Sequence, residues 1–283
     1  MTARISTDGR IRSDTLRRVL PLFRCPHCAG SLLDHSSSLR CANGHSFDLA
    51  REGYVNLAPS GRLKGSISGD DEAMVRARRT VFDAGLYAPI IDEVAAVTAS
   101  YAPSAVLDAG CGEGSYLAAI TDVSGAHGWG IDISKAAIKL AARRHPMHRY
   151  AVASSYVLPF ADATFDAVVN VFSPRDFAEM ARVTAADGVA VVVTPGARHL
   201  AELKSTLYDD ARDHDDPIER PDDVIDRTTV RFVVALPDPD LRLALLHMTP
   251  FWWSASTTRR DEIAASMTAV TVDMQLTVYR LAA

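Results

Sequence analysis

Four residues near the start of the chain have the types and the spacing of a metal site. Cys25 and Cys28 form a Cys-x2-Cys pair, and after twelve further residues Cys41 and His45 form a Cys-x3-His pair. Two tight turns that face each other can close a tetrahedral shell around Zn²⁺, and three thiolates favour a soft or borderline ion. We therefore predict a structural zinc site, since protein side chains fill all four positions. A disulfide between Cys25 and Cys28 and buried inert thiols are the alternatives.

A glycine-rich turn in the middle of the chain is a second candidate site. Gly110, Gly112 and Gly114 alternate directly after Asp108. Such a turn lets a ligand approach the backbone closely, and the helix that follows presents its positive end. The dinucleotide-binding pattern requires a glycine or alanine at the position of Ser115, so this pattern does not fit.

Two aspartates indicate which ligand this turn binds. Asp108 is badly placed beside a pyrophosphate and well placed for a ligand ammonium group. Asp132 lies 22 residues after Gly110, at the predicted end of the next strand, where a carboxylate can accept hydrogen bonds from both ribose hydroxyls. An adenosine ligand with an amino-acid tail satisfies both acids, which predicts S-adenosylmethionine. Each aspartate has the alternative of capping a helix or lying on the surface.

The residues that face the methyl acceptor are expected after a later strand. Asn170 and Phe172 precede Pro174, and an amide beside an aromatic ring can hold a planar nitrogen in line with a methyl group. Capping of the next helix is the alternative role of Asn170. Trp252 and Trp253 either stack on an extruded base or seal a sheet edge.

The composition indicates an ordinary globular protein with an uneven charge. Of the 283 residues 48% are apolar and 23% are charged, and neither an apolar run of membrane-spanning length nor a signal-peptide pattern occurs, so we expect a cytoplasmic protein without membrane contact. Up to residue 65, ten Arg or Lys face five Asp or Glu, which gives +5 against −5 for the whole chain and −10 for the rest. This basic N-terminal segment is either an RNA-binding module or a solvated arm.

Alternating strand and helix patterns must position these residues. After residue 101 this alternation predicts an α/β fold, a parallel sheet with helices on both faces. Strands are expected at 105–107, 128–133, 150–153, 167–171 and 189–194, with 231–236 and 270–279 at an antiparallel end; helices are expected from 70 to 85, after Pro89, and at 116–120, 135–144 and 177–183.

The order of these parts resembles the bacterial 23S rRNA (guanine-N1)-methyltransferases, zinc-containing class I enzymes that include macrolide-resistance members. The resemblance spans nearly the whole chain. It rests on Cys-Pro-x-Cys, Cys-x-Asn-Gly-His-Ser-Phe-Asp, the stretches 51–57 and 82–89, the glycine turn and 170–174. It implies a flexible tail (1–15), a zinc-binding RNA-recognition module (16–57), a linker and helix (58–88) and a Rossmann-like methyltransferase domain (89–283). It also implies a homodimer whose zinc modules hold a 23S rRNA hairpin.

The same resemblance implies a reaction and a set of site residues. The methyl group of S-adenosylmethionine passes to N1 of a guanine, with macrolide resistance as one biological outcome. Arg76, Arg78 and Arg79 are expected to hold RNA phosphates, or else to form a solvated helix face. A small-molecule methyltransferase and a catalytically silent zinc-dependent RNA-binding protein are the alternative functions. The expected cofactor site is Asp108, Gly110, Gly112, Gly114, Asp132, Ile133, Ser154 and Tyr87, and the expected catalytic set is Asn170, Phe172 and Pro174.

Overall fold

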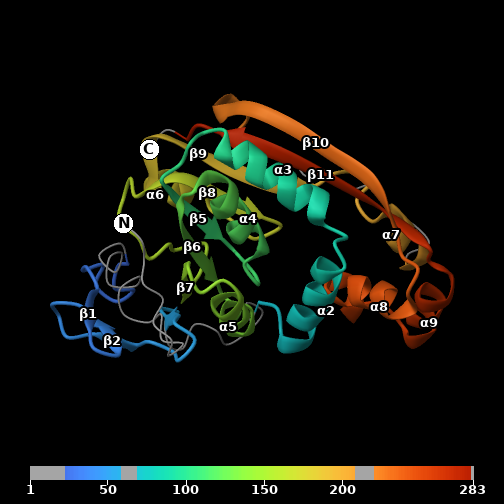
Figure 1. Cartoon of the computed structure of the whole chain (residues 1–283), viewed down its shortest axis with the longest axis horizontal. Helices are drawn as coiled ribbons and strands as arrows, with labels where there is room; N and C mark the ends of the chain where they lie inside the picture. The colour runs from blue at the N-terminus through green and yellow to red at the C-terminus, as the bar shows by residue number, and fades with distance from the viewer. Residues whose placement is uncertain (1–22, 59–68, 208–219, 282–283) are drawn as a thin grey trace.

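The computed structural model describes residues 23–58, 69–207 and 220–281 (Figure 1). The predicted flexible tail at 1–15 lies outside the described residues, as does the predicted linker between 59 and 68.

A mixed sheet forms the centre of the molecule. Eight strands within the described residues make up this sheet. From one edge to the other they are β10 (Val224–Ala235), β11 (Ala269–Tyr279), β9 (Thr184–Pro195), β8 (Phe165–Val171), β5 (Ala105–Ala109), β6 (His127–Asp132), β7 (Arg149–Val152) and β4 (Val55–Asn56). Neighbours from β9 to β4 are parallel, whereas β11 is antiparallel to both β9 and β10. The predicted doubly wound sheet with an antiparallel end is therefore confirmed.

The central strands are mostly apolar because both of their faces are covered. In β5, Val106 and Leu107 are both fully buried but belong to two different clusters of core side chains. The edge strand β10 has no buried side chain and begins with a largely polar stretch at 226–229, so the apolar signal of its first half is weak. This explains why the sequence predicted only its last residues, 231–236.

Helices cover the sheet on both sides. The described α-helices are α2 (Glu72–Asp83), α3 (Ala88–Ala99), α4 (Ser115–Ser124), α5 (Lys135–Arg144), α6 (Phe177–Val183), α7 (Ala201–Leu207), α8 (Pro239–His247) and α9 (Thr257–Ser266). Asp71 caps α2 by accepting hydrogen bonds from the N–H groups of Ala73 and Met74, each at 2.8 Å. The sequence missed α7, α8 and α9. Of these, α8 and α9 have weak amphipathic patterns, and the packing of neighbouring elements stabilises them.

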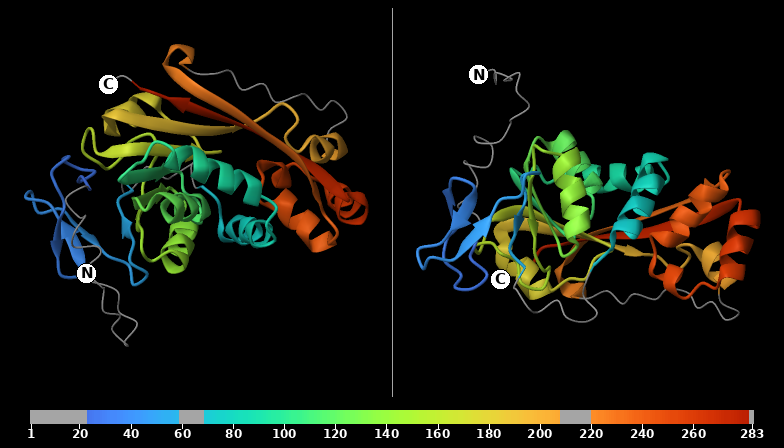
Figure 2. Two further views of the ribbon diagram at one scale, coloured as in Figure 1. Left: turned by 45° about the horizontal axis from the view of Figure 1, so that its top comes forward. Right: turned by 90° about the horizontal axis from the view of Figure 1, so that it is seen from below.

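The predicted zinc module packs on the face of the sheet that also carries α6. It forms a small sheet of β1 (Leu33–His35), β2 (Ser38–Arg40) and β3 (Ser46–Asp48), and its last strand, β4, extends the main sheet beside β7. The ring of Phe23 stacks on Phe160 at 5.2 Å, and the N–H of Arg24 donates to the carbonyl of Pro159 at 2.7 Å. The module and the helices α8 and α9 lie at opposite ends of the molecule (Figure 2). Buried side chains of the zinc module and of the main sheet belong to one core cluster. The predicted boundary at residue 57 is a change in sequence pattern.

No helix in the described part of the chain is both long enough and apolar enough to cross a membrane.

Candidate functional site

The four predicted metal ligands meet at one point of the small module. Their ligand atoms all lie within 4.8 Å of one another. The Sγ atoms of Cys28 and Cys41 are 3.7 Å apart, and Nδ1 of His45 is 3.5 Å from Sγ of Cys25 and 3.3 Å from Sγ of Cys41. A tetrahedral zinc ion with its usual bond lengths places two sulfurs about 3.8 Å apart, and a sulfur and a nitrogen about 3.5 Å apart. The side chains therefore fit Zn²⁺.

Backbone hydrogen bonds hold these ligands on two tight turns. The N–H of Cys25 donates to the carbonyl of Gly30 at 2.8 Å, and the N–H of Cys41 donates to the carbonyl of His45 at 3.1 Å. A hydrogen bond from the backbone of Gly30 is the largest cause that lowers the pKa of the Cys28 thiol, to about 6. A thiolate is the form that binds metal. His27 is not part of the cluster, since its ring packs beside that of His45 at 5.0 Å.

The glycine turn joins β5 to α4. Gly110, Gly112 and Gly114 all have positive φ, at 98°, 55° and 91°. A side chain at Gly110 would collide with Ser173, which places the segment after β8 directly against the turn. The carboxyl ends of β5 and β8 therefore meet at one crevice, as expected for neighbouring parallel strands.

Asp108 lies in this crevice as a buried carboxyl group without a partner. It is 1% exposed, and neither of its oxygens has a hydrogen-bond partner among the described residues. Burial, and then the charge of Asp132, raises the pKa of Asp108 to about 8. An unpaired buried carboxylate is costly, so a ligand ammonium group would satisfy it. This orphaned carboxyl fits the amino group of S-adenosylmethionine.

Asp132 ends β6 on the other side of the turn. Its Oδ2 accepts a hydrogen bond from the N–H of Gly112 at 2.9 Å, and its Oδ1 accepts one from the N–H of Ser134 at 2.7 Å. Burial is the main cause that raises its pKa. Each carboxylate oxygen can accept a second bond, which leaves capacity for ribose hydroxyls. The predicted residues Ile133 and Ser154 follow β6 and β7, and both are partly exposed at the same end of the sheet.

Asn170 does not present its amide nitrogen to a ligand. The side chain is fully buried, and its Nδ2 donates to the carbonyl of Ala109 at 2.7 Å and to that of Pro174 at 3.4 Å. The alternative role as a helix cap is wrong, because Asp176 accepts the hydrogen bonds at the start of α6. Asn170 thus ties the Pro174 loop to the end of β5.

Phe172 is exposed in this loop, as is Pro174. Phe172 is 41% exposed. Its positive φ of 51° is a strained backbone conformation for a bulky residue. Its ring stacks on His199 at 5.9 Å, and the ring of Tyr87 meets the edge of His199 at 6.4 Å. Tyr87 is buried, and the three rings form a row beside the crevice. No local pattern marks His199, since a single histidine in a turn has no distinctive spacing.

Two of the three arginines of α2 contact acids instead of facing solvent. Nη1 of Arg78 lies 2.6 Å from Oδ2 of Asp70, and Arg79 pairs with Asp83 and, at 3.0 Å, with Glu113. Both side chains thus lie against acids of the protein, and their contact with RNA phosphate stays a prediction. The sequence also missed the buried Glu113, although an acid within a glycine turn was a usable signal.

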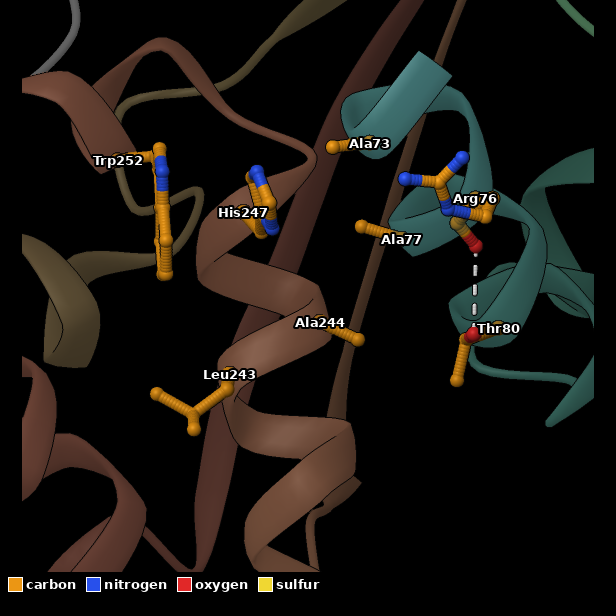
Figure 3. Close-up of a pocket in the computed structure, with 8 residues that line it drawn as sticks. All are labelled: Ala73, Arg76, Ala77, Thr80, Leu243, Ala244, His247 and Trp252. Carbon is orange, nitrogen blue, oxygen red and sulfur yellow. Dashed lines mark hydrogen bonds between the residues drawn. The ribbon is translucent and has the colours of Figure 1, made fainter.

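The remaining arginine, Arg76, lines an open groove of about 390 Å³ between α2 and α8 (Figure 3). Its side chain is 71% exposed, and its nearest acid, Glu72, is exposed as well. Trp252 closes one end of the groove, with its faces covered by His247 at 4.0 Å and by the guanidinium of Arg260 at 3.8 Å. Trp252 is therefore not an open platform for a base, whereas Trp253 is 67% exposed. The groove is lined by Ala73, Arg76, Ala77, Thr80, Leu243, Ala244, His247 and Trp252.

Comparisons with known proteins match the two units separately and together. Residues 23–65 match the zinc-ribbon family model described as "RlmA, N-terminal", and residues 106–196 match the model "Methyltransferase domain". A "23S rRNA (guanine(748)-N(1))-methyltransferase" of Streptomyces fradiae is 40% identical over 68% of this chain and 69% of its own length. A "Putative 23S rRNA (guanine-N(1)-)-methyltransferase" of Micromonospora griseorubida is 36% identical over 93% of this chain and 98% of its own length. A Bacillus subtilis protein with the same description is 34% identical, over 91% and 96%.

Proposed function

The chain belongs to the family of 23S rRNA (guanine-N1)-methyltransferases with an N-terminal zinc ribbon and a class I methyltransferase domain, and from this membership we propose its reaction and its substrate. It transfers a methyl group from S-adenosylmethionine to N1 of a guanine in a 23S rRNA hairpin. The observation that carries this proposal is the unpaired carboxyl of Asp108 beside the glycine turn, in a chain that also has a complete zinc ligand set.

The cofactor supplies an electrophilic methyl group on a sulfonium sulfur. Asp108 would hold the ammonium of its amino-acid portion and Asp132 its ribose, while Gly110, Gly112 and Gly114 leave room for close approach. Guanine N1 forms a bond to the methyl carbon as the carbon–sulfur bond breaks, and the N1 proton passes to solvent. Orientation of the two reactants contributes much of the rate, and such effects reach roughly 7–11 kcal/mol in favourable cases.

The loop after β8 is suited to orient the guanine. Phe172 offers an exposed ring, and the buried Asn170 fixes the Pro174 carbonyl against the end of β5. In this proposal Phe172 stacks on the base, and Asn170 and Pro174 act as positioning residues through the loop backbone. Stacking on an aromatic ring contributes roughly 1–3 kcal/mol per base.

The zinc module supports an RNA substrate by its position and charge. It packs on the same sheet as the catalytic crevice, and residues 16–57 carry five arginines against three acids, within a segment up to residue 65 whose net charge is +5. We further propose a cytoplasmic homodimer in which two such modules grip one hairpin. Light scattering tests the dimer.

Incubation of unmodified 23S rRNA with tritiated S-adenosylmethionine tests the reaction. Primer extension should then stop at one guanine, because N1 methylation blocks base pairing, and Asp132→Ala should remove both label and stop. The proposal would be contradicted if the RNA became labelled without a stop in primer extension, or if only small molecules became labelled. Resistance is measured separately, as the inhibitory macrolide concentration for cells with and without the active enzyme.

A further inference from the structure

Arg78 places a positive charge directly against the glycine turn, on the side of Gly112. A methyl group added at the α-carbon of Gly112 would lie 3.3 Å from Nη1 of Arg78, so the guanidinium touches the turn itself. The side chain is 27% exposed and faces the crevice between α2 and the turn. Asp70 and Asp132 are the acids that face it, while Glu113, which follows Gly112 in the turn, pairs with Arg79.

The fold holds the start of α2 against the end of β6. Oγ of Ser134 donates to the carbonyl of Asp70 at 2.6 Å, and a methyl group added at Gly69 would lie 2.8 Å from Cγ2 of Ile133. The start of α2 therefore lies beside the residues that follow Asp132, and Arg78, two turns further along α2, reaches the glycine turn. Burial raises the pKa of Asp132, and the charge of Arg78 is among the smaller causes that lower it.

A sulfonium nucleoside with an amino-acid tail carries an ammonium and a carboxylate on one carbon atom. Asp108 can satisfy the ammonium, but its negative charge cannot satisfy the carboxylate. Arg78 has five N–H donors in a planar fork, so it can bond to Asp70 on one side and to a second carboxylate on another. We propose that Arg78 binds the carboxylate of the methionine portion of the cofactor, opposite the ammonium site at Asp108. This inference rests on the S-adenosylmethionine site described above.

The role of Arg78 differs from a purely structural tie between α2 and the glycine turn in one measurable respect. A structural tie affects every ligand of the turn, whereas a carboxylate contact affects only ligands that have a carboxylate. S-adenosylhomocysteine and its decarboxylated analogue, the corresponding propylamine, differ in this group alone. Their affinities for the zinc-loaded full chain can be measured by calorimetry without any methyl transfer.

Arg78→Ala should weaken binding of S-adenosylhomocysteine by roughly 10- to 100-fold, the usual range for a charge-assisted hydrogen bond. The same variant should bind the decarboxylated analogue as the wild type does. Arg78→Gln, which keeps most of the packing, should show the same selective loss. Arg76→Ala, on the exposed face of α2, is the matched control and should bind both ligands normally.

An equal loss for both ligands would assign Arg78 a structural role and overturn the proposal. Unchanged affinity for S-adenosylhomocysteine in Arg78→Ala and Arg78→Gln would overturn it as well. If the wild type binds neither ligand, the cofactor assignment itself is wrong. The proposed cofactor site and the proposed contact of Arg78 with the carboxylate are therefore refuted by different results.

Discussion

Replacement of Asp108 by asparagine should make the protein more stable at alkaline pH. The carboxyl group is buried and has no partner among the described residues, and its pKa is raised to about 8, against about 3.9 in an unfolded chain. A folded state with a raised carboxyl pKa binds more protons than the unfolded state. The contribution of Asp108 to the free energy of unfolding is therefore complete below pH 4 and is lost as the pH rises towards 8.

The size of this effect follows from the two pKa values. Between pH 5 and pH 8 the wild type should lose roughly 3.5 kcal/mol of unfolding free energy through this group alone. Asparagine has nearly the same shape and no charge, so the difference in unfolding free energy between Asp108→Asn and the wild type should grow in favour of the variant by about this amount from pH 5 to pH 8.

Urea unfolding of the zinc-loaded chain, without cofactor, measures this difference at each pH. Asp187→Asn, at an exposed acid in β9 of the same sheet, is the control and should run parallel to the wild type. If the free energies of Asp108→Asn and the wild type also stay parallel from pH 5 to pH 8, the argument from an unpaired buried carboxyl is refuted. Binding should respond oppositely: the affinity of the wild type for S-adenosylhomocysteine should rise between pH 6 and 8, and Asp108→Asn should lose both the affinity and the pH dependence.

Four other substitutions test separate parts of the structure. Cys41→Ser should lower the zinc content measured by atomic absorption from one per chain and lower the melting temperature, since the small module depends on the metal; unchanged content would disprove the ligand set. Phe160→Ala, which removes the ring beneath Phe23, should cost about 3–5 kcal/mol in urea unfolding, and a loss under 1 kcal/mol would show that the module is not docked there. Gly110→Ala should abolish cofactor binding in calorimetry because of positive φ and the collision with Ser173, and normal binding would contradict this close approach. Arg76→Ala should weaken hairpin RNA in a filter-binding assay by a few fold at low salt and reduce the salt dependence; a salt dependence equal to that of the wild type would exclude a phosphate contact.

Local patterns in the sequence were sufficient where neighbouring residues carry the function. The zinc ligands lie on two short turns, so their spacing alone predicted the cluster that the structure brings within 4.8 Å. The alternating glycines with Asp108 and Asp132 predicted the cofactor crevice for the same reason, because each acid ends a strand beside the turn.

Other features depend on contacts between segments far apart in the chain. The sequence placed Arg78 on a helix but could not show whether it faces solvent, RNA or the glycine turn, which begins 32 residues later. The sequence could not show that the amide nitrogen of Asn170 donates to the carbonyl of Ala109, 61 residues earlier, and the predicted contact of this residue with a base stays a prediction. The docking of the zinc module through Phe23 and Phe160 is equally invisible to a local pattern.

The sequence by itself determined the spacing of the metal ligands, the alternation of strands and helices up to β9 and the class of cofactor. These features follow from residue types at short, fixed spacing, which backbone geometry converts directly into position. Only the tertiary structure decided which side Arg78 faces, what the amide of Asn170 holds and how β4 joins the main sheet. Those outcomes depend on the packing of whole elements against one another, and no short-range spacing encodes that packing.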